Sequence, residues 1–214
     1  DYERAVQIRP SSVEAWLHRA FLLHQIGRTT EALKHYSRVL EMEPKNVSAL
    51  RNRAVIHMTA GKPKSALSDL SRAIELEPEK KDHYYNRGVA HRQLKQYGLA
   101  IDDFSSALAA SPRDPDSLVN RGFCYEKQGS QGKALADFTK ACTVAPGNAV
   151  ARYNRGRLHL RQGNLQSALT DLSVALRLSP NYRAALVARA EVNKRLGRPR
   201  DAEADEKLAE ELGR

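Results

Sequence analysis

The sequence predicts an all-α protein made of six successive helix pairs, and three observations predict it. Prolines recur every 34 residues without insertion or deletion, at Pro10, Pro44, Pro78, Pro112, Pro146 and Pro180. An alanine recurs at the same period. Apolar or small residues spaced three and four apart precede it, which is typical of the buried stripe of an amphipathic helix. A period of this length indicates a repeat protein, so the repeat is the unit of the predicted fold.

Composition and charge exclude several classes of protein. The chain has 214 residues, of which 41% are hydrophobic and 28% are charged, as in an ordinary soluble folded protein. No stretch approaches the ~18 consecutive apolar residues of a membrane span, so membrane insertion is not expected. The two cysteines, Cys124 and Cys142, are too few for a disulfide framework and favour an intracellular, cytoplasmic setting. The net charge of +10 allows contact with acidic partners.

The predicted repeats begin three residues after each proline. Their boundaries are 13–46, 47–80, 81–114, 115–148 and 149–182, followed by a shorter, partly polar repeat at 183–214. Residues 1–12 match the end of a repeat, with Asp1, Tyr2, Ala5 and Ile8 in phase. We therefore expect residues 1–12 to be the end of a truncated preceding repeat, and the chain to be a segment of a longer array.

The first helix of each repeat carries its predicted stripe at positions 4, 8, 11 and 14, counted from the start of the repeat. In the first repeat these are Trp16, Ala20, Leu23 and Ile26. Histidines at position 11, which are His57, His91 and His159, are interpreted as core residues. Position 15 is glycine in every repeat but the third, which has Lys95, and glycine accepts the left-handed conformation that ends a helix.

The second helix of each repeat begins around an alanine at position 20, which is present in all six repeats. A large residue follows four positions later, as in Phe104 and Phe138, and then a small one, as in Ala107 and Ala141. Small residues facing large ones allow two helices to approach closely. The proline then ends the helix. In the last repeat Glu206 replaces the large residue, which suits a polar terminal helix that caps an array.

These features together resemble the tetratricopeptide repeat. The resemblance covers essentially the whole chain and rests on the period of 34, the small residue of the first helix, the alanine–large–small pattern of the second helix and the closing proline. It implies an alpha-solenoid of stacked antiparallel helix pairs in a right-handed superhelix. Its concave face, lined by the first helices, would hold a peptide or helix of a partner.

Two polar residues recur beside the predicted stripes. Arginine occupies position 7 of every repeat and aspartate occupies position 23 of all but the first, which has His35. Since half-buried charges are costly unless paired, we expect a structural ion-pair ladder rather than a basic track for nucleic acid. Its members are Arg53, Arg87, Arg121 and Arg155 with Asp69, Asp103, Asp137 and Asp171. Whether each pair lies within a repeat or between neighbours stays open.

Asparagine occupies position 6, directly before the arginine, in four repeats. An amide offers both a donor and an acceptor, so a row of amides on the concave face could hold the backbone of an extended peptide. Alternatively, each asparagine bonds to a neighbouring helix. The predicted peptide-binding groove comprises Asn52, Asn86, Asn120, Asn154, Tyr85, Phe123, Tyr153 and Arg157. Apolar residues rimmed by basic ones suit a segment with some acidic character.

The predicted function is that of a non-catalytic protein–protein interaction scaffold and subunit of a larger complex. The alternative is an architectural spacer in a large intracellular assembly, such as a cytoskeletal or ciliary one, and RNA binding is a weaker third hypothesis. No phosphate loop, dinucleotide fingerprint or nucleophile motif occurs, so no enzyme, small-molecule substrate or cofactor is expected. The cysteines have no histidine at ligand spacing, which argues against a metal site.

Overall fold

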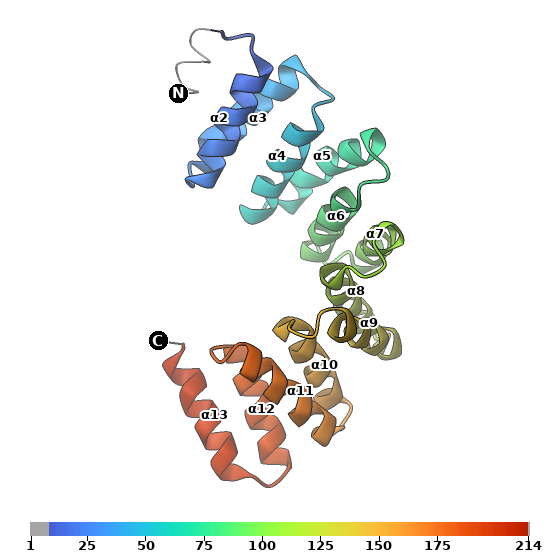
Figure 1. Ribbon diagram of the computed structural model, residues 1–214, viewed down its shortest axis with the longest axis vertical. Helices are drawn as coiled ribbons and strands as arrows, with labels where there is room; N and C mark the ends of the chain where they lie inside the picture. The colour runs from blue at the N-terminus through green and yellow to red at the C-terminus, as the bar shows by residue number, and fades with distance from the viewer. Residues whose placement is uncertain (1–8, 214) are drawn as a thin grey trace. The chain divides into compact units, whose positions relative to one another are not determined.

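The computed structural model describes residues 9–213, and this part of the chain contains twelve α-helices and no strand (Figure 1). The expected end of a preceding repeat, including Asp1, Tyr2, Ala5 and Ile8, lies almost wholly outside the described residues. The first helices of successive pairs are α2 (Val13–Gln25), α4 (Val47–Thr59), α6 (Lys81–Gln93), α8 (Pro115–Lys127), α10 (Ala149–Arg161) and α12 (Arg183–Arg195). The second helices are α3 (Thr29–Met42), α5 (Pro63–Leu76), α7 (Tyr97–Ala110), α9 (Gln131–Val144), α11 (Leu165–Leu178) and α13 (Pro199–Glu211).

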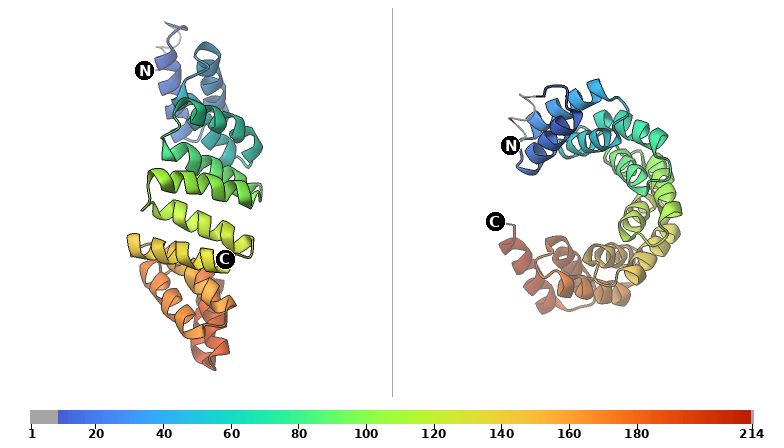
Figure 2. Two further views of the ribbon diagram at one scale, coloured as in Figure 1. Left: turned by 90° about the vertical axis from the view of Figure 1, so that its right-hand side faces the viewer. Right: turned by 45° about the horizontal axis from the view of Figure 1, so that its top comes forward.

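The chain divides into two compact units, Asp1–Ser111 and Pro112–Arg214. Within each unit the helices form two layers, one of first helices and one of second helices (Figure 2). Neighbouring first helices contact one another, α2 with α4 and α4 with α6 in one unit, α8 with α10 and α10 with α12 in the other. Within each unit, neighbouring second helices make no such contact along the described chain, so the layer of first helices is the tighter, inner layer.

Four of the six first helices begin after a capping side chain, the exceptions being α6 and α12. Ser12, Asn46, Asp114 and Asn148 each accept a hydrogen bond from the backbone N–H three residues on, which satisfies an otherwise unpaired donor of the first turn. The three prolines outside the 34-residue register, Pro63, Pro115 and Pro199, open α5, α8 and α13. Proline fits the start of a helix because its fixed φ is already helical and its missing N–H has no partner there.

The turn inside each pair ends the first helix with a left-handed residue. Gly27, Gly61, Gly129, Gly163 and Gly197 have φ between 71° and 80°. Lys95 adopts φ 59° at the same position and is the only non-glycine residue with positive φ in the described part of the chain. The backbone of the turn is therefore set by the fold, and the third pair adopts it without the residue that favours it.

Close approach of the two helices in a pair explains the small residue at position 8. A Cβ atom added to Gly88 would lie 2.9 Å from the ring of Phe104, and one added to Gly122 would lie 2.8 Å from the ring of Phe138. Both rings are fully buried. Leu70 faces an alanine, Ala54, whereas Leu172 faces a glycine, Gly156, whose added Cβ would lie 3.0 Å from the leucine. The small residue at position 8 thus leaves the space that the large residue of the partner helix fills.

The core differs from the predicted stripe at three positions of the first helices. Position 14 is not a core position, since Ile26 is 66% exposed at the end of α2. Position 3 is buried in all six first helices, and position 10 is buried in all but α2. Ala49 and Ile56 of α4 pack with Tyr36 and Val39 of the preceding pair. The prediction considered only the face that each first helix turns to the second helix of its own pair. Stacking of each pair on the preceding one creates a second buried face on the first helix.

The histidines at position 11 are half-buried rather than core residues. His91 is 13% exposed at its side chain, and its Nδ1 lies 2.7 Å from Oε1 of Gln96 at the end of the same turn. Position 11 borders the core near the turn, where a polar ring can keep one edge in contact with water. The core interpretation of His57, His91 and His159 was therefore only partly correct.

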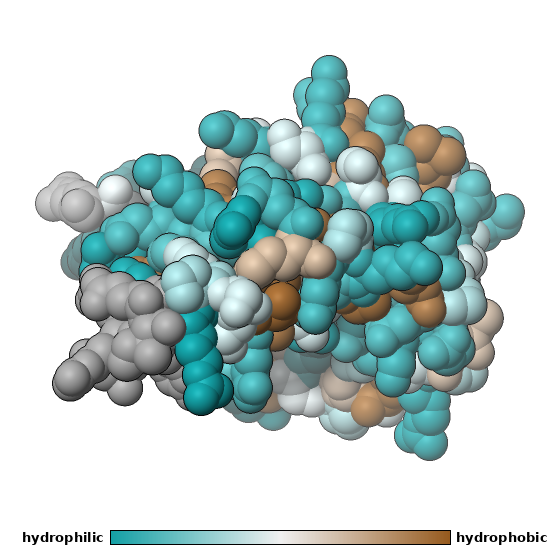
Figure 3. All heavy atoms as spheres, turned by 90° about the horizontal axis from the view of Figure 1, so that it is seen from above, coloured by the Kyte–Doolittle hydropathy of each residue, from teal (hydrophilic) through white to brown (hydrophobic). Residues whose placement is uncertain are grey.

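One face of the molecule is mainly polar (Figure 3). Hydrophilic residues dominate the face shown in Figure 3, where hydrophobic residues occur in small, scattered groups. None of the helices within residues 9–213 combines the length and the apolar character that a membrane span requires.

Candidate protein-binding surface

The arginines at position 7 pair with the aspartates at position 23 of the same helix pair. The shortest N–O distances are 2.7 Å for Arg53–Asp69, Arg87–Asp103, Arg155–Asp171 and Arg189–Asp205, and 2.8 Å for Arg121–Asp137. In each pair both Nε and Nη2 of the arginine donate to the carboxylate. This two-point geometry is the strongest form of such a contact, and it raises the pKa of each of these arginines.

Within each unit, the same arginines also reach the preceding helix pair. Nη1 of Arg53 donates to Ser37 Oγ on α3, and Nη1 of Arg87 donates to Ser71 Oγ on α5. Arg155 and Arg189 make longer contacts of this kind with Thr139 and Ser173. Each of these guanidinium groups thus joins three helices. The aspartates are nearly buried and the arginines about a quarter exposed, so these charges hold the scaffold together and offer little surface to a ligand.

The first pair departs from this pattern. His35 stands where the other pairs have aspartate, and its ring stacks on Trp16 with centroids 4.9 Å apart. Burial lowers the pKa of His35, and the nearby positive charge of Arg19 lowers it further. An aromatic contact therefore replaces the ion pair in this repeat.

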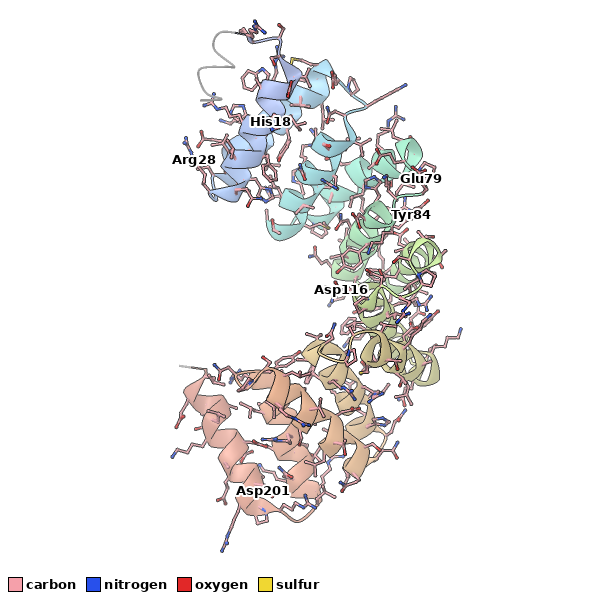
Figure 4. The ribbon with its side chains drawn as sticks, viewed as in Figure 1. His18, Arg28, Glu79, Tyr84, Asp116 and Asp201 are labelled. Atoms are coloured by element: carbon pink, nitrogen blue, oxygen red, sulfur yellow. The ribbon has the colours of Figure 1, made fainter. Side chains whose placement is uncertain are left out.

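The asparagines at position 6 lie in the inner layer, on α4, α6, α8 and α10, but they are not equivalent. Asn86 is half-buried and makes no hydrogen bond among the described residues. Asn52 lies beside the hydroxyl of Tyr36, whose pKa burial raises to about 12 while the asparagine partly opposes that rise. Figure 4 shows the side chains, with His18 labelled on α2 and Asp116 on α8, which are first helices of their units.

Two asparagines bond to their own helices. Nδ2 of Asn120 donates to the carbonyl of Asp116 at 2.8 Å, and Nδ2 of Asn154 donates to the carbonyl of Val150 at 2.9 Å. Asn154 is also only 8% exposed. It differs from the expected open groove residue because an amide four residues after a carbonyl can fold back onto it. The four asparagines therefore do not present a uniform row of amides to a ligand. The amide of Asn86 is the most available of the four.

The aromatic residues of the predicted groove face both the inner surface and the core. The ring of Tyr85 is 5.9 Å from that of Phe104, so it partly covers the core of its own pair. Tyr153 lies against Tyr182 at 4.9 Å. The ammonium group of Lys127 lies over the ring of Phe123 at 5.3 Å. These rings give each unit a half-exposed apolar surface, which in the second unit lies beside basic groups.

The sequence did not reveal an ion cluster that joins α8 and α10. Glu126 accepts from Arg157 at 2.6 Å and from Arg161, and its side chain is only 2% exposed. Arg157, predicted as a groove residue, is therefore already paired and is 19% exposed. The only signal in the sequence is that position 12 carries glutamate in this repeat, where others have histidine, methionine, arginine, leucine or lysine.

The described residues hold no group of three or more histidine, cysteine, aspartate or glutamate side chains placed to bind a metal ion. Cys124 and Cys142 are both buried, and both are reduced thiols rather than halves of a disulfide. Burial raises the pKa of the Cys142 thiol, which keeps it in its unreactive protonated form.

Sequence profiles described as "Tetratricopeptide repeat" match residues 13–56, 51–115, 96–149, 125–183 and 153–213. No curated protein matches the chain. Among solved structures, the chain is similar to YrrB, described as a TPR protein with an unusual peptide-binding site, at 24% identity and a TM-score of 0.71, covering 88% of this chain and 97% of that one.

Two further structures are similar at lower identity. The Cut9–Hcn1 hetero-tetramer of APC/C matches at 21% identity and a TM-score of 0.81, covering 99% of this chain and 42% of that one. PilW, a type IV pilus biogenesis factor, matches at 21% identity and a TM-score of 0.81, covering 91% of this chain and 90% of that one. At these identities the likeness concerns the fold of stacked helix pairs.

Proposed function

Because the chain belongs to the tetratricopeptide repeat family, we propose that it is a non-catalytic scaffold whose inner helices bind a segment of a partner protein. The observation that carries this proposal is the inner layer itself. In the unit of residues 1–111 it carries the amide of Asn86, which has no hydrogen-bond partner among the described residues, together with the half-exposed ring of Tyr85. In the unit of residues 112–214 it carries half-exposed aromatic rings beside basic side chains. The arginines at position 7, in contrast, are engaged within the scaffold.

The similar structures support this class of function without identifying a partner. YrrB is described as having a peptide-binding site, and Cut9–Hcn1 is a hetero-tetramer of APC/C. Both descriptions are compatible with a subunit that holds another chain in a larger complex. The buried, reduced cysteines support an intracellular setting.

The partner segment would be extended or helical and carry some acidic character. An extended segment could use backbone groups to reach Asn86, while its side chains pack between Tyr85 and Val89 of α6. The positive net charge of +10 would favour an acidic segment over a basic one and would speed its association.

The proposal is tested by photo-crosslinking in the native complex. A photoreactive residue at Val89, on the inner side of α6, is compared with one at Asp102, which is exposed on α7. Adducts with the partner are expected from position 89 but not from position 102, and Asn86→Ala should reduce their yield several-fold. Adducts from position 102 alone would favour the architectural spacer. An RNA adduct whose yield falls steeply with salt would favour RNA binding.

A further inference from the structure

The positive charge of the chain is concentrated in one repeat. Residues 149–182 contain five arginines and one acidic residue, Asp171, which gives a net charge of +4 out of +10 for the whole chain. Four of these arginines lie on α10, and they share only two carboxylates, those of Asp171 and Glu126. This helix therefore has more guanidinium donors than acceptors. The Nε atoms of Arg152 and Arg157 are both buried without an acceptor among the described residues.

The two carboxylates divide the arginines between two sides of α10. Asp171 on α11 accepts from Arg155 and Arg152, which belong to the packing between the two helices of the pair. Glu126 on α8 accepts from Arg157 and Arg161, which face the neighbouring first helix in the inner layer. Arg161 keeps 49% of its side chain exposed although it is paired. Part of its guanidinium is thus available to a second anion.

An aromatic pair and an exposed valine adjoin these arginines. The guanidinium of Arg157 lies 5.8 Å from the ring centre of Tyr153, whose ring contacts that of Tyr182. Val150, which lies two turns before Arg157 on the same side of α10, is 47% exposed. Basic, aromatic and aliphatic groups are therefore gathered on one stretch of the inner layer.

We propose that Arg157 and Arg161 anchor a carboxylate of an acidic peptide segment, with Glu126 as an internal competitor for the same donors. This inference rests on the proposed inner-surface function and assigns the partner's acidic residues to the repeat at 149–182. A partner carboxylate would accept from the guanidinium groups at their exposed side, and the apolar side chains next to that carboxylate would pack on Tyr153 and Tyr182. A peptide fits this surface better than a nucleic acid because the basic site is compact and lies beside apolar side chains, whereas a nucleic acid backbone needs a continued basic track.

Glu126 gives the site a selectivity that arginines alone would lack. Its carboxylate already satisfies part of both guanidinium groups, so a ligand with a single isolated charge gains little by binding. A segment with several carboxylates gains more, because the surplus charge of the repeat attracts it as a whole. The expected partner is therefore an acidic stretch rather than a single terminal carboxylate.

The test measures binding of a fluorescein-labelled deca-glutamate peptide to the full chain at low salt, with a (Gly-Ser)5 peptide as the neutral probe. The double variant Arg157→Gln, Arg161→Gln should weaken deca-glutamate binding by about tenfold or more, since each charged hydrogen bond contributes substantially. The matched control is Lys140→Gln with Arg177→Gln, which removes two charges from exposed positions on the outer helices α9 and α11. This control should weaken binding by less than about threefold.

The variant Glu126→Gln tests the competition by Glu126. It removes the competing charge and retains an acceptor, so binding should tighten by about threefold or more. Arg161→Gln alone, at a half-exposed side chain, keeps the test valid should the double variant fail to fold. Equal weakening by the two double variants, no tightening by Glu126→Gln, or tighter binding of a ten-nucleotide RNA than of deca-glutamate would each overturn the assignment. A partner that crosslinks at position 89 while deca-glutamate fails to bind would leave the proposed function intact and reject this inference.

Discussion

At the scale of single residues, the turn of the third helix pair is the clearest departure from the repeat. Lys95 adopts φ 59° where the other five pairs have glycine with φ between 71° and 80°. A side chain at positive φ brings its Cβ close to the backbone, which costs about 1–2 kcal/mol for an ordinary residue. The surrounding helices impose this conformation, because the turn has the same hydrogen bonds as its neighbours, with Gln96 N donating to His91 O as Lys62 N donates to His57 O.

We expect Lys95→Gly to raise the free energy of unfolding by about 0.5–1 kcal/mol, the relief of strain being partly offset by the greater freedom of glycine in the unfolded chain. Chemical denaturation measures the change. Gly61→Ala is the matched reverse variant, since an added Cβ there meets nothing within 4 Å. It should lose a comparable amount through conformation alone, and a stabilising Gly61→Ala would contradict this account.

At the scale of helices, the arginine of each first helix secures the pair and, within each unit, its neighbour. Sequence periodicity placed arginine and aspartate beside the core, but it could not decide between pairing within a repeat and pairing between repeats. The structure shows contacts to the aspartate of the same pair and, for Arg53 and Arg87, to a serine of the preceding pair. A hydroxyl residue recurs at this position of the second helix in five successive repeats, but its period alone does not tell which arginine it contacts.

A double-mutant cycle tests the pairing. For Arg121→Ala and Asp137→Ala we expect a coupling free energy of about 1–3 kcal/mol, because each single change leaves the other charge half-buried and unpaired. For Arg155→Ala and Asp137→Ala, which are not paired with each other, coupling below about 0.5 kcal/mol is expected. Urea denaturation of each set provides the values. Comparable coupling in the two cycles would show that the charges act as a diffuse field rather than as pairs.

At the scale of the whole molecule, stability depends on pH through histidines that lie beside the core. Burial is the main reason that the pKa values of His35 and His57 are lowered. Arg19 adds to the effect at His35, whereas at His57 the charge of Asp69 partly opposes it. A histidine with a lowered pKa is neutral in the fold but binds a proton in the unfolded chain below its ordinary pKa of about 6.5. The stability contributed by such groups is complete above that pH and is lost as the pH falls below it.

We therefore expect the urea midpoint to decrease between about pH 7 and pH 5.5, before most carboxylates titrate. His57→Leu, which introduces the residue found at position 11 of the first repeat, should reduce this decrease. His18→Gln, at an exposed side chain, is the control and should alter the decrease less. If the two variants show the same dependence on pH as the unchanged chain, burial of His57 does not account for the loss.

The local structure of each helix pair could be predicted from the sequence, because helix starts, turns and close contacts depend on residues near one another in the repeat. The 34-residue period, the glycine turns and the match of small to large residues all belong to this class, and they led to the family. The recurrence of asparagine at position 6 could also be identified in the sequence. The hydrogen bonds of Asn120 and Asn154 to their own helices could not be predicted, since two acceptable rotamers compete at each site.

Two features were decided only by the tertiary structure. They are the helix faces that a neighbouring pair covers and the charged side chains that contact each other. Position 10 became core because the preceding helix pair covers it, as at Ile56, and position 14 remained exposed at Ile26. Glu126 meets Arg157 and Arg161 from 31 and 35 residues away, a contact created by the stacking of α8 on α10. The sequence by itself determined the helix pairs and their period, because these depend on local spacing. The stacking of helix pairs decided which residues form the ion cluster and how available the Asn86 amide is. It does so because it brings together residues whose separation along the chain follows no recognisable pattern.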